Sequence, residues 1–248
     1  SLDAKNTEAV AQLGYALYLL GKTSQAEERI DALLNTQPSN GSANAVKAFL
    51  FAERHQFNSA KTALQKADAA QRNSSLYLSA KGYVADKEGD NISAILAYQE
   101  AVKQDASNGQ VWVWLSSVLI RVANTPEDYA KANQALQKAT ALLPHAPLIP
   151  YAQGQLALKQ GDFNNAIAQF QQALSLSPNS TETLYQLSIA YERAGRKAES
   201  DTTQKRFEKV NAYQRTVNNL QIRIGHEPNS LALWKSLLKL AQENDDPE

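Results

Sequence analysis

The chain repeats a small-residue position at intervals of 34 residues. It is held by Gly14, Ala48, Gly82 and Ser116 and then, after one step of 38 residues, by Gly154 and Ser188. A second small-residue position recurs at the same intervals, at Ala26, Ala60, Ala94, Ala132, Ala166 and Ser200. A fixed period of this size is typical of a solenoid, in which each unit buries its apolar face only against its neighbours. We therefore expect residues 1–248 to form a single domain, built as one continuous array.

The segment 147–180 carries the fullest version of the pattern. Its marker residues are Gly154, Ala157, Gly161, Asp162, Phe163, Ala166, Phe170, Ala173 and Pro178. This pattern resembles the tetratricopeptide repeat, a pair of helices A and B joined by a turn. Two helices approach closely only where no bulky side chain stands between them, which explains the small residue at the crossing. The resemblance implies an all-α fold, a right-handed α-α superhelix, that serves as a scaffold for binding.

Counting from this segment divides the chain into six units. They are 7–40, 41–74, 75–108, 109–146, 147–180 and 181–214. We place the four extra residues of the fourth unit at 124–127, because Asp128 and Tyr129 then align with Asp162 and Phe163. Their sequence, Asn-Thr-Pro-Glu, is typical of turns and helix starts, so we expect a longer loop between the two helices of this unit.

The pattern changes within the sixth unit. No proline or glycine interrupts residues 197–224, and apolar residues recur there at steps of three or four. This pattern predicts one long helix over 197–224, which Gly225 terminates. Pro228, Asn229 and Ser230 then open a last helix, 230–244. Either this lone helix caps the array or the chain is a fragment of a longer protein. The final Asp-Asp-Pro-Glu resembles the start of another helix and favours a fragment.

Composition and motifs narrow the function. The 25 basic and 25 acidic residues balance, so no net charge attracts nucleic acid or anionic lipid. No apolar run approaches the roughly 20 residues that span a bilayer, so we expect no membrane insertion. His55, His145 and His226 are too far apart for a metal site, cysteine is absent, and no phosphate-binding glycine loop occurs. We therefore expect no metal, no cofactor and no enzymatic activity.

Aromatic residues mark the helix A face that, by the resemblance, lines the concave side of the superhelix. They are Tyr15, Tyr18, Phe49, Tyr83, Trp114, Tyr151 and Tyr185. Aromatic side chains present a large area at low entropic cost, which suits a groove that binds a peptide. The alternative is that these rings pack against the adjoining repeat and meet no ligand.

These observations favour a protein-interaction scaffold that binds a peptide in an aromatic groove and helps to assemble a multiprotein complex of the bacterial envelope. One alternative is a chaperone-like factor that handles a secreted or haem-receiving polypeptide, as in cytochrome c maturation. Another is a structural spacer or self-associating array. The expected partner is thus a protein or peptide, and the oligomeric state stays open. An extracytoplasmic site such as the bacterial periplasm is expected, although a chain without cysteine is compatible with the cytosol as well.

Overall fold

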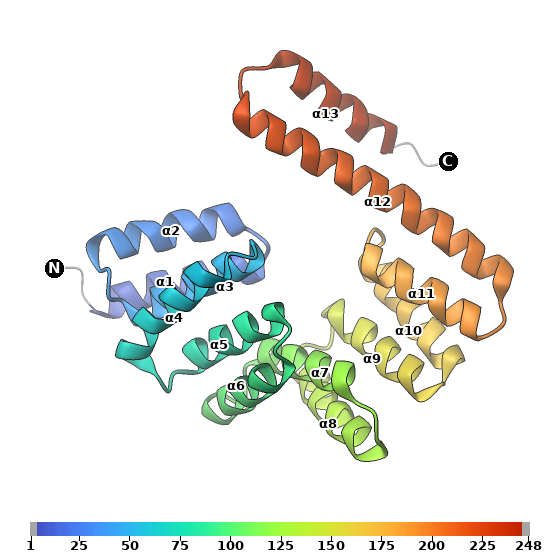
Figure 1. Ribbon diagram of the computed structural model, residues 1–248, viewed down its shortest axis with the longest axis horizontal. Helices are drawn as coiled ribbons and strands as arrows, with labels where there is room; N and C mark the ends of the chain where they lie inside the picture. Colours follow the sequence, from blue (N-terminus) through green and yellow to red (C-terminus); the bar gives the residue numbers. More distant parts are fainter. Residues whose placement is uncertain (1–3, 245–248) are drawn as a thin grey trace. The chain divides into compact units, whose positions relative to one another are not determined.

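The computed structural model describes residues 4–244, which form thirteen α-helices and no strand (Figure 1). The helices are α1 (Ala4–Leu19), α2 (Thr23–Thr36), α3 (Gly41–Glu53), α4 (Phe57–Gln71), α5 (Ser75–Glu88), α6 (Asn91–Gln104), α7 (Gly109–Val122), α8 (Pro126–Leu142), α9 (Leu148–Gln160), α10 (Phe163–Leu176), α11 (Thr181–Arg193), α12 (Lys197–His226) and α13 (Leu231–Asn244). Each consecutive pair from α1 to α12 corresponds to one of the six expected units. The predicted all-α repeat fold is confirmed.

The helices group into two compact units, which are described separately. Unit 1 is Ser1–Ala152 and unit 2 is Gln153–Glu248, so that the boundary falls inside α9. Within unit 1, α1, α3, α5 and α7 each pack on their own helix B, and α3, α5 and α7 also pack on both helices of the preceding pair. In unit 2, α11 packs on its own helix B, α12, and on the preceding helix B, α10.

A small residue stands at each crossing because the partner side chain leaves no room for a larger one. A Cβ atom added to Gly154 would lie 2.6 Å from Cε1 of Phe170, and one added to Gly82 would lie 2.6 Å from Cδ1 of Tyr98. Both rings are fully buried and cannot move aside. The crossing predicted from the 34-residue period is therefore present in both units.

The inserted residues of the fourth unit only partly follow the prediction. Asn124 and Thr125 lie in the connection, but Pro126 and Glu127 form the first turn of α8, so the insertion lengthens the helix as well as the loop. The backbone N–H of Asp128 donates to the Thr125 hydroxyl oxygen at 3.2 Å, and the Asp128 carboxylate accepts from the backbone N–H of Thr125 at 3.0 Å. This capping box, with proline in the first turn, fixes an early helix start.

The C-terminal helices also differ slightly from the prediction. Helix α12 continues through Gly225 to His226, beyond the expected end at 224, because glycine without a proline after it can remain helical. Helix α13 begins at Leu231, one residue later than expected. It folds back along the second half of α12 and packs there through Leu220, Ile224 and Leu233 (Figure 1). None of the helices in the described range is long and apolar enough to cross a membrane.

Candidate functional site

Rings from four A helices of unit 1 meet in one group, which we call the aromatic cluster: Tyr15 and Tyr18 of α1, Phe49 of α3, Tyr83 of α5 and Trp114 of α7. Phe49 lies at its centre, with ring centroids at 5.4 Å from Tyr15, 5.2 Å from Tyr18, 5.2 Å from Tyr83 and 5.5 Å from Trp114. The contact between Phe49 and Trp114 skips a whole repeat. The structure thus brings together five of the seven aromatic residues that the sequence singles out.

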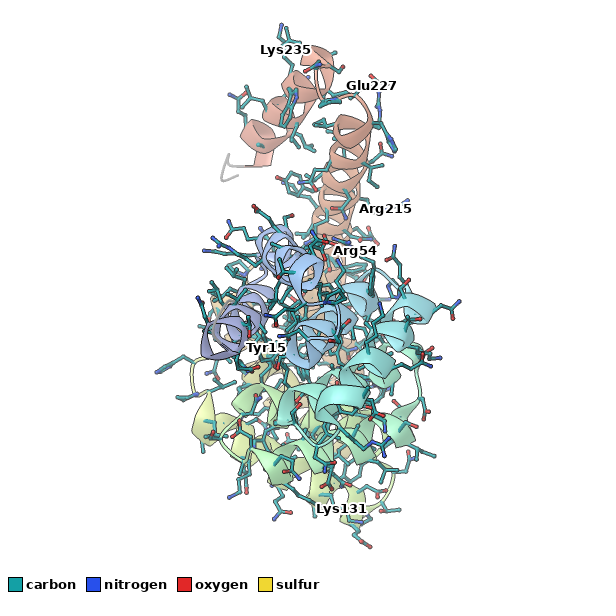
Figure 2. The ribbon with its side chains drawn as sticks, turned by 90° about the vertical axis from the view of Figure 1, so that its left-hand side faces the viewer. Tyr15, Arg54, Lys131, Arg215, Glu227 and Lys235 are labelled. Carbon is teal, nitrogen blue, oxygen red and sulfur yellow. The ribbon has the colours of Figure 1, made fainter. Side chains whose placement is uncertain are left out.

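Members of the aromatic cluster differ in how much surface they offer to a ligand. Phe49 is fully buried, and Tyr15 and Tyr83 are only 9% and 6% exposed, so these three rings fill the interior between the repeats. Figure 2 shows Tyr15 among the helices of unit 1. Tyr18 and Trp114 are half-buried and keep part of their surface accessible. A ligand on this face would therefore meet Tyr18 and Trp114 first.

Tyr98 of α6 extends the aromatic cluster on its inner side. Its ring centroid is 5.9 Å from that of Trp114, and the side chain is fully buried. Burial raises the pKa of Tyr98 well above its usual value, so the hydroxyl stays protonated at any physiological pH. The sequence marks Tyr98 as a helix B residue at the position of Phe170, and this equivalence could have placed it beside the A helices.

The carboxylate of Glu53, at the end of α3, lies next to the aromatic cluster. It accepts hydrogen bonds from the hydroxyls of Tyr18, at 3.1 Å, and of Tyr83. The Nζ atom of Lys87 is 3.6 Å from the same carboxylate and 5.2 Å from the centre of the Tyr83 ring. Burial, and then the charge of Glu53, raise the pKa of Tyr18, which keeps its hydroxyl a donor. Polar and charged groups of both signs therefore border the accessible rings.

The two remaining predicted residues lie outside the aromatic cluster as defined. Tyr151 is half-buried on α9, near the end of unit 1. Tyr185 belongs to unit 2, where it is 47% exposed on α11 and lies 5.7 Å, between ring centroids, from Phe207 of α12. It lines an open hollow of about 670 Å³ between α11 and the first turns of α12.

A second hollow, of about 430 Å³, lies on unit 1 between α6, α7 and α8. Trp112, Leu115 and Leu119 form its apolar part, and its rim carries Lys103, Lys131 and Lys138. Lys131, which projects from the outer edge of the unit in Figure 2, is paired with Glu127 at 2.7 Å, and Lys103 with Glu100 at 3.0 Å. Across residues 4–244, no three side chains of the metal-binding types gather into a site.

Paired helices with a small residue at each crossing define a helical-repeat protein, a class whose exposed helix faces bind other proteins. Comparison of the sequence with models of known protein families identifies the type of repeat. Residues 154–195 match a family model described as TPR repeat, so the predicted tetratricopeptide resemblance is confirmed. The sequence matches no curated protein.

Solved structures with a similar fold are tetratricopeptide-type arrays. A tetratricopeptide repeat protein from Parabacteroides merdae has a TM-score of 0.58 and 15% identity, over 96% of this chain and 100% of its own. PilF from Pseudomonas aeruginosa has a TM-score of 0.59 and 20% identity, over 83% and 96%. TTC0263 from Thermus thermophilus has a TM-score of 0.57 and 19% identity, over 74% and 98%. Likenesses at these identities establish the fold.

Proposed function

We propose that this chain is a protein-interaction scaffold that binds a peptide segment of its partner at the aromatic cluster of unit 1. The observation that carries the proposal is the pair of half-buried rings, Tyr18 and Trp114, held over a buried floor of Phe49 and Tyr83. Aromatic edges on a rigid base give a peptide contact area without a further loss of rotamer entropy. The tetratricopeptide fold supports the general role.

The groups around these rings suit a peptide of mixed character. Glu53 already accepts from two tyrosine hydroxyls, so it orients Tyr18 and leaves the ring edge for apolar side chains. Lys87 is about one third exposed, and its ammonium can turn from Glu53 toward a carbonyl or carboxylate of the ligand. Arg121, on the same helix as Trp114, is held by Asp86, with Nη2 to Oδ1 at 2.8 Å, and adds a fixed charge. We expect affinity to come from the rings and orientation from the charges.

The wider setting belongs to the same proposal. We propose that the bound segment comes from a component of a larger assembly of the bacterial envelope, the setting expected from the sequence. Fractionation of the source cells, with detection of the chain and its captured partner in the same envelope fraction, tests this part separately.

The main experiment compares partner capture by variants that change only the accessible rings. Tyr18→Ala/Trp114→Ala removes the proposed contacts, and Tyr213→Ala removes a half-buried tyrosine of unit 2 as a matched control. Phe49→Ala is unsuitable, because a cavity at a fully buried ring costs about 3–5 kcal/mol of stability. After circular dichroism confirms folding, the chains are used as bait in extract, and the recovered partner is then divided into overlapping peptides for binding measurements.

We expect one defined segment to bind the unaltered chain and the Tyr213→Ala variant equally, and to lose at least tenfold in affinity with Tyr18→Ala/Trp114→Ala. Equal binding by all three chains would rule out the aromatic cluster as the site. Many unrelated unfolded polypeptides bound with similar affinity would instead favour the chaperone alternative.

A further inference from the structure

The hollow on unit 2 lies where the next A helix of the array would pack. Its lining comes from α11 and the first turns of α12, and includes Tyr185, Ile189, Glu192, Lys197, Asp201 and Gln204. In unit 1, the equivalent surfaces of the α1–α2, α3–α4 and α5–α6 pairs are covered by α3, α5 and α7. Here α12 is 30 residues long, and within the described residues α13 packs on α12 alone. The usual place of a helix is therefore left open.

The filled junctions of unit 1 reveal which residues meet an incoming A helix. We number positions from the first residue of each 34-residue unit. Position 12 of one unit meets position 13 of the next helix A: Tyr18 donates to Glu53 at 3.1 Å, and Asp86 pairs with Arg121 at 2.8 Å. The second of these contacts joins opposite charges.

Position 21, on helix B, meets position 14 of the next helix A. Nη1 of Arg54 donates to Oε1 of Glu27 at 2.8 Å, and Nζ of Lys61 lies 2.6 Å from Oε1 of Glu88. The sign of the charges is reversed between these two junctions, but the pairing is kept. Position 21 therefore selects the charge at position 14 of the helix that covers it.

Position 9 supplies the apolar part of the same contact. The ring of Tyr15 meets Phe49 at 5.4 Å, and Phe49 in turn meets Tyr83 at 5.2 Å, in each case between position 9 of successive units. A complete junction thus combines an apolar contact at position 9 with polar contacts at positions 13 and 14 of the incoming helix.

In the sixth unit, the positions that face the incoming helix, 9, 12 and 21, hold Ile189, Glu192 and Asp201. Ile189 is half-buried, and both carboxylates are exposed and form no ion pair within residues 4–244. Lys197 is the one cation of the hollow, and it is exposed on a flexible stem that can turn toward solvent. A helix that packs in the hollow would therefore need basic residues opposite the carboxylates of Glu192 and Asp201.

We propose that this hollow binds an amphipathic helix of a partner protein, with an apolar residue followed four and five residues later by two basic residues. The apolar residue packs on Ile189 and Tyr185, and the two basic residues pair with Glu192 and Asp201. The basic pair also lies in the last turn of the bound helix, where the helix dipole favours positive charge. This surface shares no residue with the aromatic cluster, so each of the two proposals can be tested without the other.

The charge pattern selects a foreign helix rather than a second copy of this chain. Positions 13 and 14 hold Leu19 and Leu20 in α1, and Glu243 and Asn244 in α13. The other five A helices each carry at most one basic residue at these two positions. None would pair with both carboxylates.

The test uses a peptide whose packing face is already known from this structure. The probe is the α3 segment, residues 41–56, acetylated and amidated, with Glu53→Arg, so that Phe49 is followed by two arginines. The matched peptide keeps Glu53 and carries Arg54→Glu, so that two acidic residues follow Phe49 instead. Binding of both peptides to the full chain is measured by fluorescence anisotropy at low salt.

We expect the basic peptide to bind about tenfold more tightly than the acidic one, and the preference to reverse in Glu192→Lys/Asp201→Lys. Glu100→Lys/Glu127→Lys, which makes the same change in net charge on exposed carboxylates of unit 1, should leave the preference intact. The proposal is overturned if neither peptide binds, if the two bind equally, or if the preference survives Glu192→Lys/Asp201→Lys. Concentration-dependent self-association that the basic peptide does not compete away would assign the hollow to a second copy and overturn it as well.

Discussion

Gly154 and Phe170 show how one side chain sets the distance between two helices. The Phe170 ring occupies the space where a Cβ of residue 154 would lie, at 2.6 Å from Cε1, and burial holds the ring in place. We predict that Gly154→Leu separates α9 from α10 and destabilises unit 2 by about 1–3 kcal/mol, because the larger side chain overpacks the crossing. Urea unfolding followed by circular dichroism measures the effect.

Gly225→Ala is the matched control for this prediction. Gly225 is also helical, but a Cβ there meets nothing within 4 Å. This substitution should stabilise α12, by up to about 1 kcal/mol, because alanine loses less backbone entropy than glycine in a helix. An unchanged midpoint for Gly154→Leu would show that the assigned crossing is wrong.

Glu27 makes the junction between the first two repeats sensitive to acid. Hydrogen bonds from Arg54, and then from Lys47, lower its pKa from 4.5 to about 2. Because the folded-state pKa lies below the unfolded one, this carboxylate contributes stability above pH 4.5 that is lost as the pH falls toward 2. We predict that Glu27→Gln destabilises the chain at pH 7 and that its difference from the unaltered chain shrinks at pH 3.

Urea midpoints at the two pH values measure this difference. Glu28→Gln is the control, because Glu28 is exposed and forms no ion pair in the part of the chain described. If the difference in urea midpoint between Glu27→Gln and the unaltered chain stayed constant between pH 7 and pH 3, the assigned pairing of Glu27 with Arg54 would be contradicted.

At the scale of elements, α13 has the least support among the helices of unit 2. It packs on α12 through Leu220, Ile224 and Leu233, with Leu237 and Leu240 beside them, while Leu231, Trp234 and Leu238 remain largely exposed. We predict that amide hydrogens of residues 231–242 exchange at least tenfold faster than those of α10, because local opening of α13 exposes little apolar surface. Equal protection of the two helices would show that α13 has support from elsewhere.

The sequence predicted the helices well because the spacing of small residues is a packing requirement. Ala60 and Ala94 mark crossings for the same reason that Gly154 does, so the pairs could be counted without coordinates. The start of α8 was harder to predict, because Asn-Thr-Pro-Glu suits both a loop and a capped first turn. Only the capping box of Thr125 and Asp128 decides between them.

The candidate site was less predictable than the fold. Phe49 and Trp114 are both aromatic residues on A helices, yet one is fully buried and the other is accessible. Their difference depends on the angle between successive repeats, which brings Phe49 to 5.5 Å from a ring two repeats away. Repeat spacing carries no information on that angle. The ion pair of Glu27 with Arg54 likewise depends on which helix turns meet.

For the whole molecule, the hydrophobic cluster of unit 1 and the one at the α12–α13 end of unit 2 differ in size. Unit 1 holds the large cluster around Phe49 and Tyr98, whereas the α12–α13 end of unit 2 holds a small one around Leu220. In a repeat protein, stability is a sum of local contributions, so the parts need not unfold together. We predict that the surroundings of Trp234 unfold at a lower urea concentration than unit 1.

Two variants separate the tryptophan fluorescence of unit 1 from that of unit 2. Trp112→Phe/Trp114→Phe leaves Trp234 as the sole tryptophan and reports on unit 2, and Trp234→Phe leaves only the two tryptophans of unit 1. Each variant thus monitors the unit that it does not alter. Coincident fluorescence midpoints would show that the chain unfolds as one cooperative body.

The aromatic cluster also has an optical consequence. Tyr83 and Tyr98 lie with ring centroids 5.1 Å and 5.9 Å from Trp114, and Phe49 connects the other tyrosines to them. At such separations, a tyrosine excited by ultraviolet light passes its energy to tryptophan instead of emitting. The tyrosines of the folded aromatic cluster therefore emit little light of their own, and the return of that emission is a label-free signal that the A helices have separated.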